Sequence, residues 1–110
     1  MGLTTSMQGD VTRILLDGQL TVGNRQELKA AVQQALQDGA RKLLLDCAPT
    51  GYIDSSGLGA LVTIARRVRE SGGTVRIAGL NEDLRSLFEL TKLDTLFEIF
   101  PDGDRALAGF

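Results

Sequence analysis

Hydrophobic residues follow two patterns that alternate along this chain: short apolar runs, and longer stripes at helical spacing. The short runs predict strands at residues 3–8, 11–17, 42–46, 74–78 and 96–100. Apolar residues three and four positions apart predict four helices: one at about residues 22–38, one between Gly57 and Ser71, one that Asn81 caps, and a short one that Pro101-Asp102 opens.

The order of these elements predicts the fold class. From residue 11 onward strands alternate with helices, which implies an α/β domain with a mostly parallel sheet and helices packed on it. The turn Gly9-Asp10 joins the first two strands closely enough for them to pair antiparallel. The run Leu43-Leu44-Leu45 predicts a central strand that is buried on both faces. After it, Asp46 is interpreted as a residue that bonds the following loop, and Cys47 as a packing residue rather than a redox site.

Composition narrows the classes of function. The net charge is −2 and tryptophan is absent, so the chain lacks the basic surface and the stacking platform of a nucleic-acid binder. Histidine is absent and cysteine occurs once, so we expect neither a metal nor a cofactor. No catalytic triad and no phosphate-binding loop can be assembled, and we therefore expect no enzymatic activity. The polar first ten residues and the short apolar runs predict neither a signal peptide nor membrane insertion, so we expect a cytoplasmic protein.

One short turn stands out as a candidate site. Asp54-Ser55-Ser56-Gly57 immediately precedes the helix with the clearest apolar stripe. Asp and Ser at such a position accept hydrogen bonds from the first backbone N–H groups of the helix, and a plain capping role is the simplest interpretation. The same helix end also tolerates added negative charge, so a phosphate on a serine there would not unfold the helix.

The wider sequence around this turn resembles a known family. The ten residues that begin at Tyr52, YIDSSGLGAL, resemble the signature of the STAS domain family, in the branch of bacterial anti-sigma factor antagonists. Further similar features follow in the expected order along the chain: LDGQL at residues 16–20, GG-VRI at 72–77 and LFELTKL at 87–93. The resemblance implies one STAS-like domain over residues 1–110, with a mixed, mostly parallel β-sheet and helices packed mainly on one face.

The resemblance also implies a mechanism. An antagonist of this kind binds an anti-sigma factor, often an ATP-dependent serine kinase, and so frees a sigma factor. The kinase phosphorylates the serine that follows the aspartate of the motif, which is Ser55 here, and a serine phosphatase restores the binding form. The residues expected to contact the partner are Thr21, Asp54, Ser55, Ser56, Gly57, Leu58 and Gly59.

Several alternatives stay open at this point. Ser56 is more simply a residue of the first helical turn, and Thr21 an N-cap for the helix near residue 22. Gln19 and Thr21 stand where the family often has carboxylates. The alternative function is a soluble STAS accessory subunit of a membrane transporter of the lipid-transport ATPase type. A small-ligand sensor or enzyme at the carboxyl ends of the strands is a third hypothesis.

Overall fold

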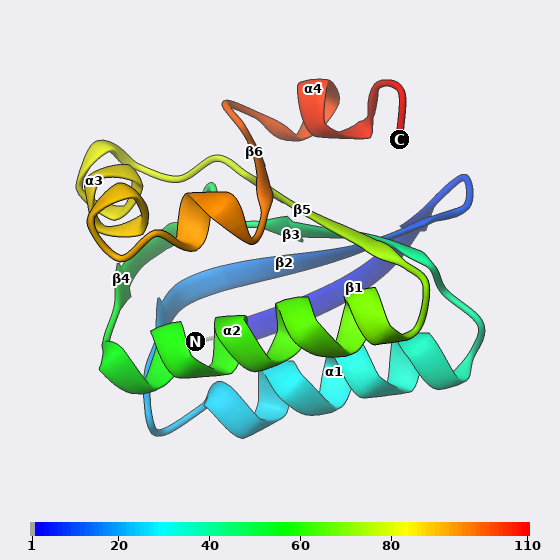
Figure 1. The fold of residues 1–110 in the computed structure, drawn as a ribbon, viewed down its shortest axis with the longest axis horizontal. Coiled ribbons are helices and arrows are strands. Elements are labelled where there is room, and N and C mark those ends of the chain that lie inside the picture. The colour runs from blue at the N-terminus through cyan, green and yellow to red at the C-terminus, as the bar shows by residue number, and fades with distance from the viewer. Residues whose placement is uncertain (1) are drawn as a thin grey trace.

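Strands and helices alternate through residues 2–110, which the computed structural model describes (Figure 1). The strands are β1 (Gly2–Gln8), β2 (Val11–Leu20), β3 (Lys42–Asp46), β4 (Thr50–Ile53), β5 (Thr74–Ala78) and β6 (Glu98–Phe100). The helices are α1 (Arg25–Gln37), α2 (Ser55–Glu70), α3 (Glu82–Leu90) and α4 (Gly103–Leu107), with a 3-10 turn η1 (Leu93–Thr95) before β6.

The sheet is mixed and mostly parallel, as predicted. Its strands are ordered β1-β2-β3-β5-β6, and β1 runs antiparallel to β2 whereas the pairs β2–β3, β3–β5 and β5–β6 are parallel. The turn between β1 and β2 contains Gly9 with φ of 64°, a left-handed conformation that suits the first central position of a two-residue hairpin loop. β4 pairs in parallel with the last residues of β2, where β3 has already ended.

Two hydrophobic cores lie on opposite faces of the sheet. Helices α1 and α2 run side by side along one face, and with α3 they enclose the larger core (Figure 1). Helix α4 covers the opposite face, where its Ala106 packs with Val11, Leu44 and Ala78. Leu43 and Leu45 belong to the first core and Leu44 to the second, so the prediction of a strand buried on both faces is confirmed.

The strand β4 was not predicted from the sequence. Pro49 and Gly51 were expected to mark an irregular loop before Tyr52-Ile53 approaches the sheet again, yet the whole of Thr50–Ile53 forms a strand. It pairs with an extension of β2 that continues past Gly18 to Leu20, and the register shifts at Gly18. Gly18 has a φ of 103°, so glycine permits the irregular backbone that lets β2 carry two partners in succession.

Two element ends and one core position also differ from the prediction. Helix α1 begins at Arg25 rather than near residue 22, and β6 begins at Glu98 rather than at residue 96, because Leu96 is still the C-cap of η1. Leu90 was expected in the apolar stripe of α3, but it is 81% exposed at the last residue of the helix. Such ends depend on tertiary contacts that periodicity alone does not report.

An arginine holds the C-terminal segment against the sheet. The guanidinium of Arg76 on β5 lies 4.9 Å from the ring centre of Phe100 and 4.3 Å from that of Phe110. It donates hydrogen bonds to the carbonyl oxygens of Ala106, at 2.9 Å, and of Ala108, at 3.2 Å. These carbonyls end α4, so a cation there also opposes the negative end of the helix dipole.

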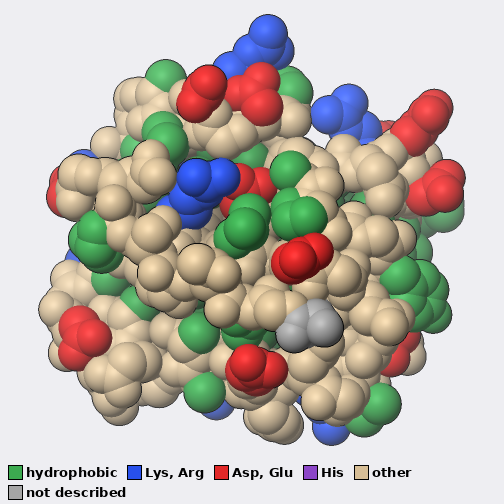
Figure 2. Space-filling view, turned by 180° about the vertical axis from the view of Figure 1, so that it is seen from behind, with side chains coloured by type: hydrophobic (Ala, Val, Ile, Leu, Met, Phe, Trp, Pro, Cys, Tyr) green, Lys and Arg blue, Asp and Glu red, His purple; other side chains and the backbone are tan. Residues whose placement is uncertain are grey.

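The surface shows no dominant charge of one sign. On the face that Figure 2 shows, acidic and basic side chains are interspersed over an otherwise uncharged surface. Within residues 2–110, none of the helices combines the length and the apolar composition needed to cross a membrane.

The two interpretations made at the end of β3 agree with the structure. Asp46 is buried, and it accepts hydrogen bonds from the backbone N–H of Ala48, at 3.0 Å, and from the guanidinium of Arg13. Cys47 is buried in the larger core, and burial raises the pKa of its thiol to about 12. A buried neutral thiol packs as a small apolar group.

We predict that the stability of the fold falls as pH rises through the alkaline range because of Cys47. Its pKa is raised from 9.0 in the unfolded reference to about 12, so the folded chain holds the thiol proton more tightly. The associated stability is present below pH 9.0 and is lost progressively as pH approaches 12. Urea unfolding across this range should show a steeper decline for the natural chain than for Cys47→Ala. Equal slopes for the two chains would contradict the prediction.

Candidate functional site

The candidate site is the first turn of α2, and Asp54 organises it. Asp54 has an extended backbone, with φ of −88° and ψ of −179°, and it is the N-cap of the helix. Its Oδ1 accepts a hydrogen bond from the backbone N–H of Gly57 at 2.8 Å, and its carbonyl oxygen accepts the first helical bond from Leu58 at 3.0 Å. The predicted capping role of Asp54 is therefore confirmed.

The second oxygen of the same carboxylate binds a different segment. Oδ2 of Asp54 accepts a hydrogen bond at 3.2 Å from the backbone N–H of Val22, in the loop between β2 and α1. The backbone N–H of Asp54 in turn donates to the carbonyl oxygen of Leu20 at 3.1 Å. Asp54 thus ties the start of α2 to the end of β2 and to the loop after it.

Gly57 allows α2 to approach β2 closely. A Cβ atom at this position would lie 2.6 Å from the carbonyl oxygen of Leu20 and 2.9 Å from the Cγ2 atom of Ile53. Both distances are shorter than van der Waals contact, so only glycine fits without displacing the backbone. Gly57 is buried, and its role is to position the helix rather than to present a side chain to a partner.

The two serines of the turn differ in exposure. Ser55 is the first residue of α2 and is exposed, whereas Ser56 is half-buried. Among the contacts of residues 2–110, no hydrogen bond involves the hydroxyl of Ser55, so this turn does not depend on that oxygen for its hydrogen bonding. The first turn of α2 contains no acidic residue after Asp54, and its unpaired N–H groups favour an anion nearby.

Thr21 does not cap α1, contrary to the alternative considered above. The N-cap is Asn24, and Thr21 lies three residues earlier in a tight turn. The hydroxyl oxygen of Thr21 accepts a hydrogen bond from the N–H of Gly23 at 3.3 Å, and its N–H donates to the side chain of Asn24 at 2.9 Å. The structure nevertheless brings this turn to the site, because the next residue, Val22, is the one bound to Asp54.

Two exposed apolar side chains beside Asp54 were not singled out from the sequence as site residues. Val22, bound to Asp54 through its N–H, is 64% exposed, and Tyr52, two residues before Asp54 on β4, is 55% exposed. Val22 was assigned to a helix, and Tyr52 was treated only as part of a motif. The available signal was an apolar residue outside any buried stripe.

The remaining predicted site residues are divided between surface and core. Leu58 is half-buried and packs against the larger core, whereas Gly59 is exposed, with nothing within 4 Å of the place where its Cβ would be. The exposed part of the predicted site therefore consists of Ser55 and Gly59, bordered by half-buried Asp54, Ser56, Leu58 and Thr21. Across the part of the chain that the structure describes, no cluster of three or more acidic or cysteine side chains could hold a metal ion.

Comparison with known proteins supports the resemblance noted in the sequence. The model of the family described as STAS domain matches residues 3–106. The anti-sigma-B factor antagonist of Staphylococcus aureus is 26% identical over 99 residues, which cover 90% of this chain and 92% of that protein. The crystal structure of TM1081 from Thermotoga maritima, at 26% identity, has a TM-score of 0.89 and covers 96% of this chain and 91% of that one.

A more distant structural similarity includes two states of one protein. The unphosphorylated SpoIIAA, an anti-sigma factor antagonist, matches with a TM-score of 0.74 at 18% identity, covering 97% of this chain and 99% of that one. The phosphorylated form, from Bacillus, matches with a TM-score of 0.75 at the same identity, covering 96% of each chain. At this level of identity the comparison concerns the fold alone.

We predict opposite effects for two glycine substitutions on α2. Gly57→Ala should lower the free energy of unfolding by about 1–3 kcal/mol, because the new methyl group overlaps the carbonyl of Leu20. Gly59→Ala should leave stability unchanged or raise it by up to about 1 kcal/mol, because alanine favours the helix and the space is open. Urea unfolding of both variants provides the comparison. Equal losses for the two would show that close packing at Gly57 is not the cause.

We further predict that Asp54→Ala loosens two segments at once. Loss of the cap should lower the free energy of unfolding by about 1–2 kcal/mol. Hydrogen exchange should accelerate both at the start of α2 and at Val22, since both N–H groups lose their acceptor. The matched control is Asn81→Ala, which removes the cap of α3. Its side chain accepts from the N–H of Leu84 and donates to the carbonyl oxygen of Thr50 at 3.5 Å, so this substitution should leave exchange at Val22 unchanged. Faster exchange confined to α2 in Asp54→Ala would contradict the proposed link.

Proposed function

This chain belongs to the STAS domain family, and from this premise we propose that it is an anti-sigma factor antagonist that phosphorylation of Ser55 switches off. In its unphosphorylated form it binds an anti-sigma factor, which is also an ATP-dependent serine kinase, and so releases a sigma factor. A serine phosphatase reverses the modification. The protein then acts by binding and not by catalysis.

One observation carries the proposal: Ser55 is exposed at the first position of α2, while the contacts that fix this turn are made by other groups. Asp54 and Gly57 hold the helix entrance through backbone N–H groups and close packing, as described above. A kinase can therefore reach the hydroxyl, and a phosphate on it disrupts none of these contacts.

The phosphate would act on the partner through charge. It adds about −1.5 to −2 charges at neutral pH, directly after the carboxylate of Asp54. In the free chain that charge faces water and the favourable end of the α2 dipole, so it costs little. Against a bound partner, however, the same charge must be desolvated close to the exposed apolar side chain of Val22, whose N–H is bound to Asp54. A difference of only about 1.4 kcal/mol between these situations weakens binding tenfold.

The comparisons support a change of charge rather than of fold. SpoIIAA matches this chain equally well in its unphosphorylated and phosphorylated forms. Residues Gln19 and Thr21, which are uncharged, lie on the β2 side of the site. With fewer carboxylates around it, the phosphate would supply most of the negative charge that separates the two states.

We predict that incubation with its cognate anti-sigma kinase and ATP places one phosphate on Ser55. Mass spectrometry of the modified chain locates the phosphate. Ser55→Ala should accept none and still bind the anti-sigma factor, whereas Ser56→Ala should be phosphorylated like the natural chain. A phosphate on Ser56 or elsewhere would overturn the assignment of Ser55.

A charged replacement separates the effect on binding from the effect on folding. Ser55→Asp should raise the Kd for the anti-sigma factor by about tenfold or more while leaving the thermal stability unchanged or slightly higher. Ser86→Asp, an exposed position on α3 with the same change in charge, is the control and should leave the Kd unchanged. Binding that is unaffected by Ser55→Asp would contradict the switch. Co-purification with a transporter ATPase in place of an anti-sigma kinase would instead favour the role of a transporter accessory subunit.

A further inference from the structure

The outer edge of β1 is unprotected over most of its length. β1 is the edge strand of the sheet, and residues 2–8 contain neither a charged residue nor a proline. Proteins usually protect such edges with lysine, proline, bulges or very short strands, because free backbone groups can pair with another chain. The opposite edge is protected in this way: β6 has three residues, includes Glu98 and is followed by Pro101.

The register of the hairpin shows which backbone groups are free. Gln8 pairs with Val11 across the two-residue loop, and the residues that flank such a loop exchange hydrogen bonds. Because the direction of backbone groups alternates along a strand, Thr4, Ser6 and Gln8 bond to β2. The N–H and C=O groups of Leu3, Thr5 and Met7 therefore point away from the sheet.

These outward groups are complementary to a copy of themselves. If a second β1 pairs antiparallel about a two-fold axis at Thr5, then Thr5 faces the partner's Thr5, and Leu3 faces the partner's Met7. Every outward N–H and C=O group of Leu3, Thr5 and Met7 then finds a partner. The side chains form apolar Leu–Met pairs and a central Thr–Thr pair, both of which stabilise antiparallel sheets.

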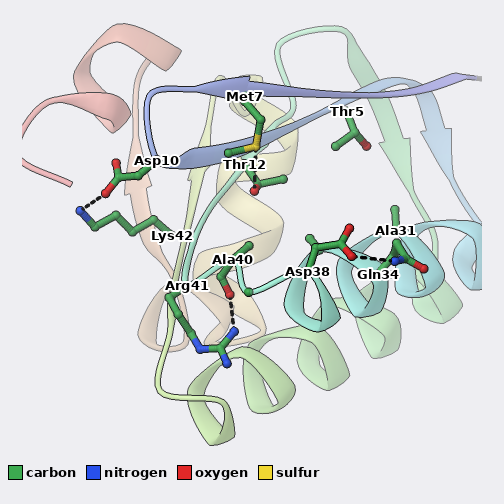
Figure 3. A pocket seen from close by; sticks show the side chains of 12 residues that line it. Thr5, Met7, Asp10, Thr12, Ala31, Gln34, Asp38, Ala40, Arg41 and Lys42 are labelled. Atoms are coloured by element: carbon green, nitrogen blue, oxygen red, sulfur yellow. Dashed lines mark hydrogen bonds and ion pairs between the residues drawn. The ribbon is translucent and has the colours of Figure 1, made fainter.

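A groove beside the edge supplies apolar surface on the same face. Thr5 and Met7 line a groove of about 570 Å³ together with Ala31 and Gln34 of α1 and with Asp38, the C-cap residue of that helix (Figure 3). Met7 is 63% exposed there, and its sulfur accepts a hydrogen bond at 3.4 Å from the hydroxyl of Thr12. Leu3, at the other end of the strand, packs partly against the larger core. A second copy would place its Leu3 beside this exposed methionine and cover it.

We propose that this chain forms a two-fold symmetric dimer through antiparallel pairing of β1 with β1 of a second copy, which joins the two sheets into one. The dimer is closed because each copy uses its single long free edge, so assembly stops at two. The pairing leaves the site on α2 uncovered, because β1 pairs with residues 11–17 of β2, whereas β4, which leads into α2, pairs beyond Gly18. The proposal is independent of the role assigned to Ser55.

Sedimentation of the purified full chain tests the proposal. At concentrations from about 10 μM to about 1 mM the mass should rise from 11.8 kDa towards twice that value. Thr5→Pro removes an outward N–H and should leave a folded monomer, because proline is tolerated where a strand edge faces solvent. Thr5→Lys, which sets two like charges across the axis, should also be monomeric. Ser86→Lys on α3 carries the same charge elsewhere and should dimerise normally.

A cross-link tests the register. In a Cys47→Ala background, Thr5→Cys should form a disulfide-linked dimer on mild oxidation, because paired Cα atoms about 5.5 Å apart suit that bond. Thr4→Cys should cross-link much less, since Thr4 would face the partner's Ser6. A natural chain that stays monomeric up to about 1 mM, or a dimer that survives both substitutions of Thr5, would overturn the proposal. Equal cross-linking through Thr4→Cys and Thr5→Cys would overturn it too.

Discussion

The two hydrogen bonds that the Asp54 carboxylate accepts fix the entrance of α2, on which the proposed function depends. One oxygen holds the first turn of α2 through Gly57, and the other holds the loop after β2 through Val22. Segments that are 32 residues apart in the chain meet at one carboxylate. The close contact of Gly57 with Leu20 adds a steric constraint to this electrostatic one, so both the position and the direction of α2 are set at its entrance.

This constraint explains how residues of the site divide their tasks. Asp54 and Gly57 build the turn and are engaged with the chain's own backbone. Ser55, between them, has an exposed side chain, and the exposed Val22 is bound to Asp54 at the same turn. The motif around this turn therefore mixes residues that form the scaffold with residues that are exposed to solvent, and burial and hydrogen bonding separate the two.

Much of the fold could be predicted from the sequence because its main elements have clear local signals. The run Leu43-Leu44-Leu45 and the apolar stripe of α2 are each long enough to define their element. β4 could not be predicted, since Thr50–Ile53 includes a glycine and exists by pairing with an extension of β2. The start of α1 was misplaced for a similar reason, because Val22 is held by Asp54 from a distant segment and not by its own helix. At the site, the capping role of Asp54 followed from local chemistry, whereas its bond to Val22 required the folded chain.

The hydroxyl of Ser55 is exposed and forms no hydrogen bond within residues 2–110, so the fold does not depend on whether it carries a phosphate. The phosphorylation proposed above would therefore not require the chain to refold. Each molecule would then be in one of two states, phosphorylated or unphosphorylated at Ser55. The lifetime of each state would be set by the activities of the kinase and the phosphatase. The phosphorylated fraction of a population of such molecules would then report the recent balance between kinase and phosphatase activity, without any change of fold.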